Sequence, residues 1–381
     1  LTNKNCHILG NLKGGSYFKN KLDKNSPHCN TKLLSNKIYN KGINEIFKLK
    51  RNTTKPINLK QQIQNNFGQT FLKEIFDPII NKKSFNCNLD KIEPYNHLFF
   101  GFSRIKAFDE MKSREIKKNK KFNSIFSFHH YSEGNSKLKN YYPKKGGAGL
   151  LVNLLEKKLK SKGIKILLNQ KIEKVECKSK LINSVTTSNS KTIRCNKIVW
   201  TLNHNILCNY TNLKFKKNKI KDFSYISLHH LVFNKSFLTN NEYINSYDPN
   251  QKISRITLYP NICKDDKWIK IWKENVKFFH LTAEVISPKL ENLNLMQKKV
   301  ISEIYQMGVI SKNTKLKFKF SESFGGRIPI PTVKNLLNSK KNFLKLRNSF
   351  KNVIFASQIS APKSTGQLLT NIYNEIKNEK Y

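Results

Sequence analysis

The sequence predicts an α/β protein. A glycine turn at 146–149 leads into a leucine-rich helical pattern and then into an alternating extended segment. Apolar residues alternate in several short stretches between 223 and 285, as in an antiparallel sheet. Near the C-terminus an apolar stretch at 352–356 precedes a helical pattern at about 365–377. Helices and strands thus alternate on both sides of a strand-rich middle region, which is typical of this fold class.

Length and composition indicate a folded protein with a basic surface. The chain has 381 residues and is 38% hydrophobic, enough for one large domain or two interleaved ones. It carries 71 basic and 25 acidic residues, a formal charge of +46, but only seven of the basic residues are arginine. Arginine is the better residue for bidentate phosphate recognition. We therefore interpret the dispersed lysines as a solvated surface and expect no specific nucleic-acid partner, while peripheral membrane association stays open.

Cysteine usage and hydropathy indicate a cytoplasmic protein. The seven cysteines include no C-x-x-C pair, so we expect neither a disulfide framework nor a zinc site. No apolar run approaches the roughly 18 residues of a membrane helix, and residues 1–11 are too polar for a secretory signal. The doublets at 129–130 and 229–230 are adjacent histidines, which point to opposite faces of a strand, so no metal site is predicted.

Within the first 140 residues, helices are predicted between 57 and 112. The first 55 residues are turn-rich and predict no long element. A helical pattern runs from Ile57 to Ile80, with a break at Phe67-Gly68 and an end near Pro78, which predicts two short helices and a hinge. Apolar residues at spacings of three and four predict an amphipathic helix over 95–112.

The stretch from 141 to 177 contains a turn, a helix and two strands. Gly146 and Gly147 permit a tight turn, and the leucine stripe of the following helix ends at Gly163. A strand is expected at 164–168, directly after this glycine. Further extended segments are expected at 172–177, 191–195 and 197–202.

The remaining chain predicts a sheet and two helices. Alternating segments at 224–233, 253–259 and 278–285 predict an antiparallel sheet, and a helix is expected at 293–307. The stretch Asn352 to Ala356 predicts a strand, and a terminal helix begins near Thr365.

Four motifs, in this order, resemble those of FAD-dependent oxidoreductases of the amine oxidase, protoporphyrinogen oxidase and phytoene desaturase class. They are Phe67-Gly68 with Pro78, the turn 143–147, the strand 171–175, and the strand 352–356 with Ser364-Thr365-Gly366-Gln367. The similarity runs from about residue 57 to the end. It implies an FAD/NAD(P)-binding Rossmann-like fold with an inserted mixed α+β substrate domain, and FAD as the cofactor.

The resemblance also implies cofactor-binding residues. The backbone at Gly146 and Gly147 would approach the cofactor, and Ile172 would contact the adenine side through its backbone. The residues Thr365, Gly366 and Gln367 would direct a helix N-terminus at the flavin pyrimidine or the pyrophosphate. The chain departs from the class after its last strand, where Ala356-Ser357-Gln358 replaces a glycine and a charged residue.

Two arginines are candidates for substrate binding. Arg255 and Glu284 resemble a pair in relatives that act near sugar-nucleotide and cell-surface polysaccharide pathways, including proteins similar to UDP-galactopyranose mutase. Arg255 either clamps a substrate phosphate or carboxylate or pairs with Glu284 on an adjacent strand, and both interpretations stay open. Arg327, within 324–329, is the second candidate.

Proteins of this class begin with a strand, a G-x-G-x-x-G turn and a helix, which hold the pyrophosphate. No such motif precedes Gly15, so we expect an N-terminally truncated form. The expected domains are 1–140, the remainder of the N-terminal FAD segment with a helical substrate part; 141–205, FAD-binding; 206–325, the substrate domain; and 326–381, the C-terminal FAD-binding segment.

The expected function is that of an FAD-dependent oxidoreductase acting on a carbon–nitrogen or carbon–carbon bond of a small molecule, in polysaccharide or isoprenoid/tetrapyrrole metabolism. One alternative is a sugar-nucleotide isomerase similar to UDP-galactopyranose mutase. Another is a non-enzymatic decayed relative or basic binding protein. The sequence nominates no catalytic residue.

Overall fold

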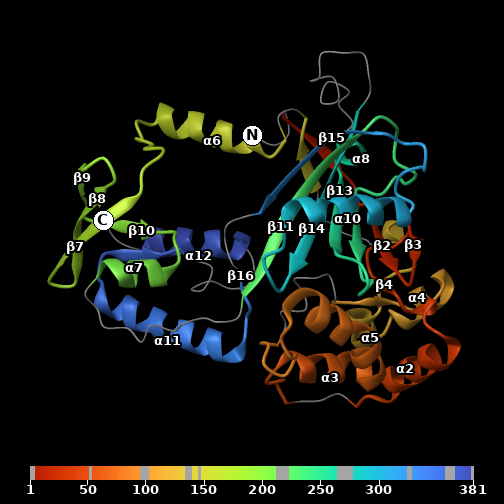
Figure 1. Ribbon diagram of the computed structural model, residues 1–381. Coiled ribbons are helices and arrows are strands. Elements are labelled where there is room, and N and C mark those ends of the chain that lie inside the picture. The colour runs from red at the N-terminus through yellow and green to blue at the C-terminus, as the bar shows by residue number, and fades with distance from the viewer. Residues whose placement is uncertain are drawn as a thin grey trace. The chain divides into compact units, whose positions relative to one another are not determined.

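The structure is a computed structural model that describes residues 5–50, 54–94, 103–133, 140–144, 147–211, 223–263, 278–323, 328–356 and 365–378. The chain forms two compact units, and each consists of two separate segments of chain (Figure 1). Unit 1 comprises Leu1–Lys158 and Asp222–Ile330, and unit 2 comprises Leu159–Lys221 and Pro331–Tyr381.

An eight-stranded sheet forms the centre of unit 1. Its order is β15-β11-β14-β13-β12-β2-β3, and β16 pairs with the beginning of β11. Neighbouring strands are antiparallel except for the parallel pair of β2 and β12. The bounds are β2 (Gly14–Phe18), β3 (Lys21–Asp23), β11 (Phe223–Phe233), β12 (Tyr243–Ser246), β13 (Ile253–Leu258), β14 (Phe279–Ser287), β15 (Leu316–Ser323) and β16 (Ile328–Pro329). The predicted antiparallel sheet of the middle region is confirmed.

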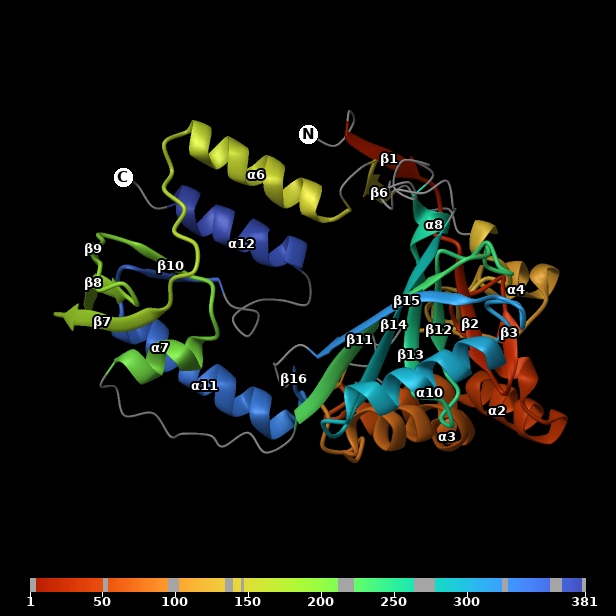
Figure 2. The ribbon, with the colours of Figure 1, turned by 45° about the horizontal axis from the view of Figure 1, so that its top comes forward.

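One helix covers one face of this sheet. Helix α10 (Leu293–Gln306), confirmed at its predicted position, lies across the strands in Figure 2. Its Met296, Val300 and Ile304 belong to one buried cluster with apolar residues of the sheet, among them Leu231 and Leu281. Because side chains alternate along a strand, the residues between these core positions lie on the opposite face.

A second core of unit 1 is mainly helical. It contains α2 (Asn36–Lys48), α3 (Leu59–Phe71), the π-helical segments η2 (Leu72–Phe76) and η3 (Pro78–Phe85), α4 (Glu110–Ile116) and α5 (Lys120–Ile125). The short segments β4 (Cys29–Asn30), η1 (Thr31–Leu33) and β5 (Ile105–Lys106) connect it to the sheet. Phe67, Phe71 and Phe76 are fully buried at its centre.

The predicted hinge is confirmed, but the predicted helix end is wrong. Gly68 interrupts α3 with φ 78° and ψ 175°, a conformation that favours glycine. The helical path continues beyond Pro78 instead of ending there, because this proline lies in the first turn of η3. Proline has no backbone N–H, and in the first turn of a helix this group has no helical hydrogen-bond partner to lose.

The predicted helix over 95–112 is also wrong at residues 103–109, and only 110–112 of its described part are helical. Ile105 and Lys106 form a strand that pairs in parallel with β4. Helix α4 begins only at Glu110, after Asp109, whose side chain accepts a hydrogen bond from the Lys112 backbone N–H. Strand pairing with a distant segment therefore overrides the helical spacing of the apolar residues.

The segment around the glycine turn follows the prediction only in part. Strand β1 (Cys6–Leu9) pairs with β6 (Asn140–Pro143), and α6 (Gly149–Ser161) follows the turn. Gly163 ends this helix with φ 77°, as predicted. The strand expected at 164–168 is wrong, because none of the described strands pairs with this segment, and Leu168 is 68% exposed. No residue of α6 is buried.

The described residues of unit 2 form two small sheets and three helices. An antiparallel sheet contains β7 (Ile172–Lys178), β8 (Leu181–Thr187) and β9 (Thr192–Arg194), and a parallel pair contains β10 (Ile198–Trp200) and β17 (Val353–Phe355). The helices are α7 (His204–Tyr210), α11 (Val333–Ser349) and α12 (Thr365–Asn378). The predicted extended segments and the terminal helix are confirmed, whereas the sequence did not predict α11.

Two further observations concern the whole chain. All seven cysteines are described and are free thiols. In the part of the chain that the structure describes, no helix is both long and apolar enough to cross a membrane.

Candidate functional site

The sheet of unit 1 has a polar, partly exposed face on the side away from α10. On β11, His229 is fully buried towards α10, whereas His230 lies on the opposite face. This confirms that the doublet points in two directions. Side chains on this open face come from five neighbouring strands: Tyr243, Arg255, His280, Thr282, Glu284, His230, Phe320 and Glu322. No group of three potential metal ligands occurs among the described residues.

His230 is held between a hydroxyl and a carboxylate. Its Nδ1 lies 2.9 Å from Thr282 Oγ1, and its Nε2 lies 3.3 Å from Glu322 Oε1. An ionised carboxylate only accepts hydrogen bonds, so Nε2 carries the proton and, in the neutral ring, the Thr282 hydroxyl donates to Nδ1. The two neighbours therefore fix both the tautomer and the orientation of this imidazole.

A row of four rings crosses the open face. The centroids of Phe320 and His230 are 6.1 Å apart, those of His230 and His280 are 5.9 Å apart, and those of His280 and Tyr259 are 4.8 Å apart. Tyr259 belongs to the short helix α8 (Tyr259–Ile262). Burial, with the charge of His230 as a smaller cause, lowers the pKa of His280 to about 4. His280 is therefore a neutral imidazole near pH 7, and it can accept or pass on a proton.

Arg255 and Glu284 face each other on β13 and β14. Arg255 Nε lies 3.8 Å from Glu284 Oε1, and the guanidinium lies 5.2 Å from the centroid of the Tyr243 ring. The two side chains thus contact each other, as one of the two interpretations of the sequence expected. The arginine side chain is still 47% exposed, so its remaining N–H groups are accessible to a ligand. Its assignment to substrate binding stays a prediction.

A cavity of about 370 Å³ adjoins Tyr243. Gly14 lies directly opposite Tyr243 in the parallel pair of β2 and β12, and a Cβ atom on Gly14 would lie 2.7 Å from the tyrosine hydroxyl. The glycine therefore provides the space that this ring occupies. Burial raises the pKa of Tyr243, so its hydroxyl keeps its proton. The cavity is lined by Asn11, Leu12, Ser26, Pro27, His28, Arg104, Ser127, Phe128, His130, Tyr131, Asn140 and Tyr243.

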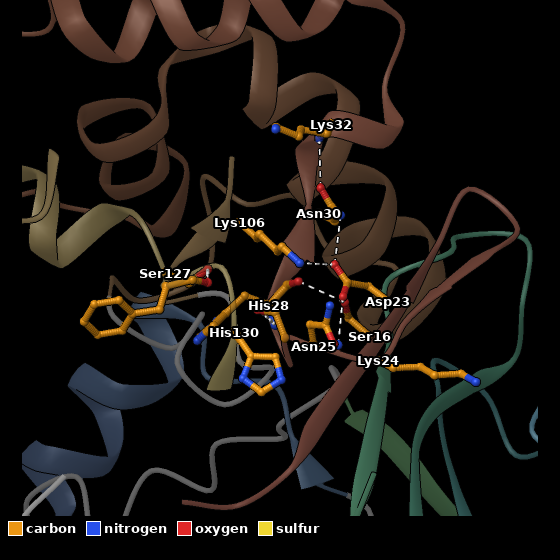
Figure 3. Close-up of polar contacts among 12 residues, drawn as sticks. Ser16, Asp23, Lys24, Asn25, His28, Asn30, Lys32, Lys106, Ser127 and His130 are labelled. Atoms are coloured by element: carbon orange, nitrogen blue, oxygen red, sulfur yellow. Dashed lines mark hydrogen bonds and ion pairs between the residues drawn. The ribbon is translucent and has the colours of Figure 1, made fainter. Parts of the chain in front are cut away.

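A polar network fixes one wall of this cavity (Figure 3). The Asp23 carboxylate accepts hydrogen bonds from Lys106 Nζ at 2.6 Å and from Asn30 Nδ2 at 2.8 Å. The Ser16 hydroxyl donates to the His28 carbonyl at 3.0 Å. The Tyr247 hydroxyl donates to the Pro27 carbonyl at 2.7 Å. Because these groups are largely buried, the loop that carries Pro27 and His28 is held in one position.

The predicted cofactor residues lie in both units. In unit 1, Gly147 is buried with φ 54°, and its carbonyl accepts a hydrogen bond from the Leu150 N–H at the start of α6. In unit 2, Ile172 is the first residue of β7, and its carbonyl accepts a hydrogen bond from the Tyr210 hydroxyl at 2.7 Å. Thr365, Gly366 and Gln367 are the first three residues of α12. Gly146 and Arg327 lie outside the described residues.

These residues fit one part of an FAD molecule. The first turn of a helix as long as α12 presents backbone N–H groups without helical partners, which suit an electron-rich group. The Ile172 carbonyl, by contrast, already has the Tyr210 hydroxyl as a partner. The sequence contains no G-x-G-x-x-G turn for the diphosphate. Of the predicted cofactor residues, only the N-terminus of α12 is therefore suited to hold an electron-rich group of FAD.

Several residues of the site were not predicted from the sequence. Side chains alternate along a strand, so Thr282 and His280 lie on the same strand face as Glu284. The sequence alone therefore indicates that these three residues share a face. Glu322, the partner of His230 Nε2, comes from β15, about ninety residues further along the chain, and no local pattern indicates this pairing. Arg104 was assigned to the interior of a helix, whereas the described residues from 103 to 109 are not helical.

The sequence matches no protein-family model and no curated protein. Among solved structures, the chain is similar to a reduced UDP-galactopyranose mutase, with a TM-score of 0.66, 15% identity, and coverage of 90% of this chain and 71% of that one. It is also similar to a protein from Exiguobacterium sp. 255-15 with the provisional name protoporphyrinogen oxidase, with a TM-score of 0.65, 10% identity, and coverage of 99% and 82%.

A third similar structure is an oxidoreductase from Methanosarcina mazei, with a TM-score of 0.57, 11% identity, and coverage of 98% and 82%. At these identities the likeness concerns the fold. The chain has a mixed α/β fold of the Rossmann-type flavoprotein kind, as the resemblance implied.

Proposed function

We propose that this chain forms the substrate-binding part and a portion of the cofactor site of an FAD-dependent oxidoreductase of the amine oxidase-like class. One observation carries this proposal. In a fold shared with flavoproteins, α10 buries one face of the large sheet and leaves the other face with two histidines, two carboxylates, an arginine and a cavity beside it. A merely structural sheet has no need for titratable groups in such a pattern.

The residues of the open face divide the work of such a reaction. Bound FAD would accept the hydride. His280, neutral near pH 7, takes up a proton that leaves the substrate. Glu322 and Thr282 hold the ring of His230, which lies next to His280, in one orientation. Arg255 binds an anionic or carbonyl oxygen of the substrate through N–H groups that Glu284 leaves unoccupied.

Flavin binding is the first test of this proposal. The purified chain is mixed with FAD in about 0.05 M and about 0.5 M NaCl, and bound flavin is measured by absorbance after ultrafiltration. We expect saturable binding that persists at high salt, followed by reduction of the bound flavin by a substrate under anaerobic conditions. Binding that disappears at high salt reflects only the +46 charge and argues for the non-enzymatic alternative.

The sugar-nucleotide alternative is supported by the Arg255–Glu284 pair and by the similarity to the mutase structure. It predicts tight binding of a UDP-sugar and no net reduction of the flavin during turnover. An oxidoreductase of the amine oxidase-like class instead reduces its flavin with each substrate molecule. The domain assignments at 141–205 and 326–381 stay part of this proposal.

A further inference from the structure

Arg104 is the cation of the 370 Å³ cavity, and it has no counter-charge there. The residue is partly buried directly before β5. Among the residues that the structure describes, it forms no ion pair and no hydrogen bond. Guanidinium groups offer five N–H donors, and leaving them unused in a partly desolvated position is unfavourable. A bound group that accepts these hydrogen bonds would remove this cost.

The surroundings of Arg104 are electropositive. Lys117 is buried, its Nζ donates to the Phe126 carbonyl at 2.9 Å, and it lies 4.2 Å from the centroid of the Phe128 ring, which lines the cavity. Burial, with the positive charge of Arg104 as a smaller cause and Glu133 acting in the opposite direction, lowers the pKa of Lys117 to about 8. Two cations thus influence each other behind this wall.

Glu133, the carboxylate that acts against Arg104 in its effect on Lys117, contacts other groups. Glu133 Oε1 accepts a hydrogen bond from the His130 backbone N–H at 2.8 Å, and Glu133 Oε2 lies 3.8 Å from Arg114 Nε. Arg114 is also paired with Glu110 at 2.8 Å. Glu133 therefore does not neutralise Arg104.

The general excess of lysine does not account for this arrangement. Arg104 is one of only seven arginines, whereas the lysines are spread over the surface. The cavity walls also include amide, imidazole and phenol groups from Asn140, His130 and Tyr243. A planar guanidinium beside such groups is suited to bidentate recognition of a carboxylate or phosphate.

We infer that this cavity binds the anionic group of a small polar molecule, a carboxylate or a phosphate, with Arg104 as its principal partner. The inference rests on the proposed function in one respect: it takes the bound anion to be part of the substrate of unit 1. Binding of the anion itself requires no flavin.

Calorimetric titration of the full chain with inorganic phosphate, and separately with acetate, tests this inference. Ionic strength is held at about 0.3 M, so that attraction by the net charge is largely screened. We expect saturable binding of one of the two anions, and Arg104→Gln should weaken it roughly tenfold or more, because a charged hydrogen-bond pair is lost. Arg104→Lys keeps the positive charge, so its anion affinity should lie between those of the wild type and Arg104→Gln. Preference for phosphate indicates a phosphate ester, and preference for acetate a carboxylic acid.

Arg114→Gln is the matched control, because this arginine is exposed on α4 and outside the cavity lining. It should change the affinity less than twofold. Equal weakening by the two glutamine variants, or no saturable binding of either anion, overturns the inference. If Arg104→Gln does not fold, the anion affinities of Arg104→Lys and Tyr243→Phe are measured in its place. Unchanged affinity in both variants overturns the inference. Because the titration contains no flavin, failure of the flavin experiment leaves its result unaffected.

Discussion

His229 shows how one buried side chain links stability to pH. Its ring is fully buried, with Nε2 3.1 Å from Ser227 Oγ and Nδ1 2.7 Å from Ser321 Oγ. Burial, with the charge of His230 as a smaller cause, lowers the pKa of His229 to about 4. Below pH 6.5 the unfolded chain takes up a proton that the folded chain does not. Stability is therefore full above pH 6.5 and decreases as the pH falls towards 4, by at most about 3 kcal/mol for this residue.

Replacing His229 should reduce this pH dependence. We expect His229→Gln to lower stability at pH 7 through lost packing, but to lose less stability than the wild type between pH 7 and about pH 4.5. Urea unfolding at several pH values measures both quantities. His130→Gln, a change at an exposed ring, should retain the slope of the wild type. An unchanged slope in His229→Gln would show that other groups cause the acid sensitivity.

Arg104 and His280 are the residues on which the functional proposals depend most. Both were absent from the sequence-based site, for different physical reasons. His280 follows from strand alternation once its strand is known. Arg104 lines a cavity whose walls come from six separate parts of the chain between Asn11 and Tyr243, so only tertiary structure brings it into place.

At the scale of elements, the packing of α2 against α3 depends on the absence of a side chain at Gly42. A Cβ atom there would lie 2.4 Å from Cε1 of Phe71, a fully buried ring. Alanine would improve helix propensity by about 1 kcal/mol, but overpacking of a core costs about 1–3 kcal/mol. The clash should prevail, since Phe71 is surrounded by other buried side chains.

Gly42→Ala should therefore destabilise the protein by roughly 1–2 kcal/mol, as measured by urea unfolding. Gly149→Ala is the control, because it lies in α6 and a Cβ atom there would have no neighbour within 4 Å. We expect this second change to be neutral or slightly stabilising. A stabilising Gly42→Ala would mean that Phe71 moves aside at little cost.

Elements with strong local periodicity were predictable, and those fixed by distant partners were not. The alternation in β11, β13 and β14 and the stripe of α10 identified these elements close to their observed bounds. Ile105 and Lys106 are a strand only because β4 lies beside them. The apolar segment 164–168 has strand periodicity, yet none of the described strands pairs with it. Polar-rich α11 offered little contrast between its faces. Helix α2 is amphipathic, with Ile43 and Ile46 on its buried face, so its pattern was available although no helix was predicted there.

At the scale of the whole molecule, the two ends of one long insertion lie together. Unit 1 includes 222–330, and the chain enters and leaves this segment through Phe223 and Pro329, which are paired in β11 and β16. Folding of the sheet therefore brings the two connections to unit 2 together. This reduces the loop-closure entropy that the parallel pair of β10 and β17 must overcome, because its strands are more than 150 residues apart in sequence.

The formal charge of +46 should make stability increase with salt. Raising NaCl from about 0.02 M to about 0.3 M shortens the Debye length from roughly 20 Å to roughly 6 Å and screens repulsion among the lysines. Salt also weakens exposed ion pairs such as Arg114–Glu110, but each of these contributes only about 0.5 kcal/mol. The buried Lys106–Asp23 pair is hardly screened. Thermal unfolding should therefore shift to higher temperature as the NaCl concentration is raised. A shift to lower temperature would show that ion pairs outweigh repulsion.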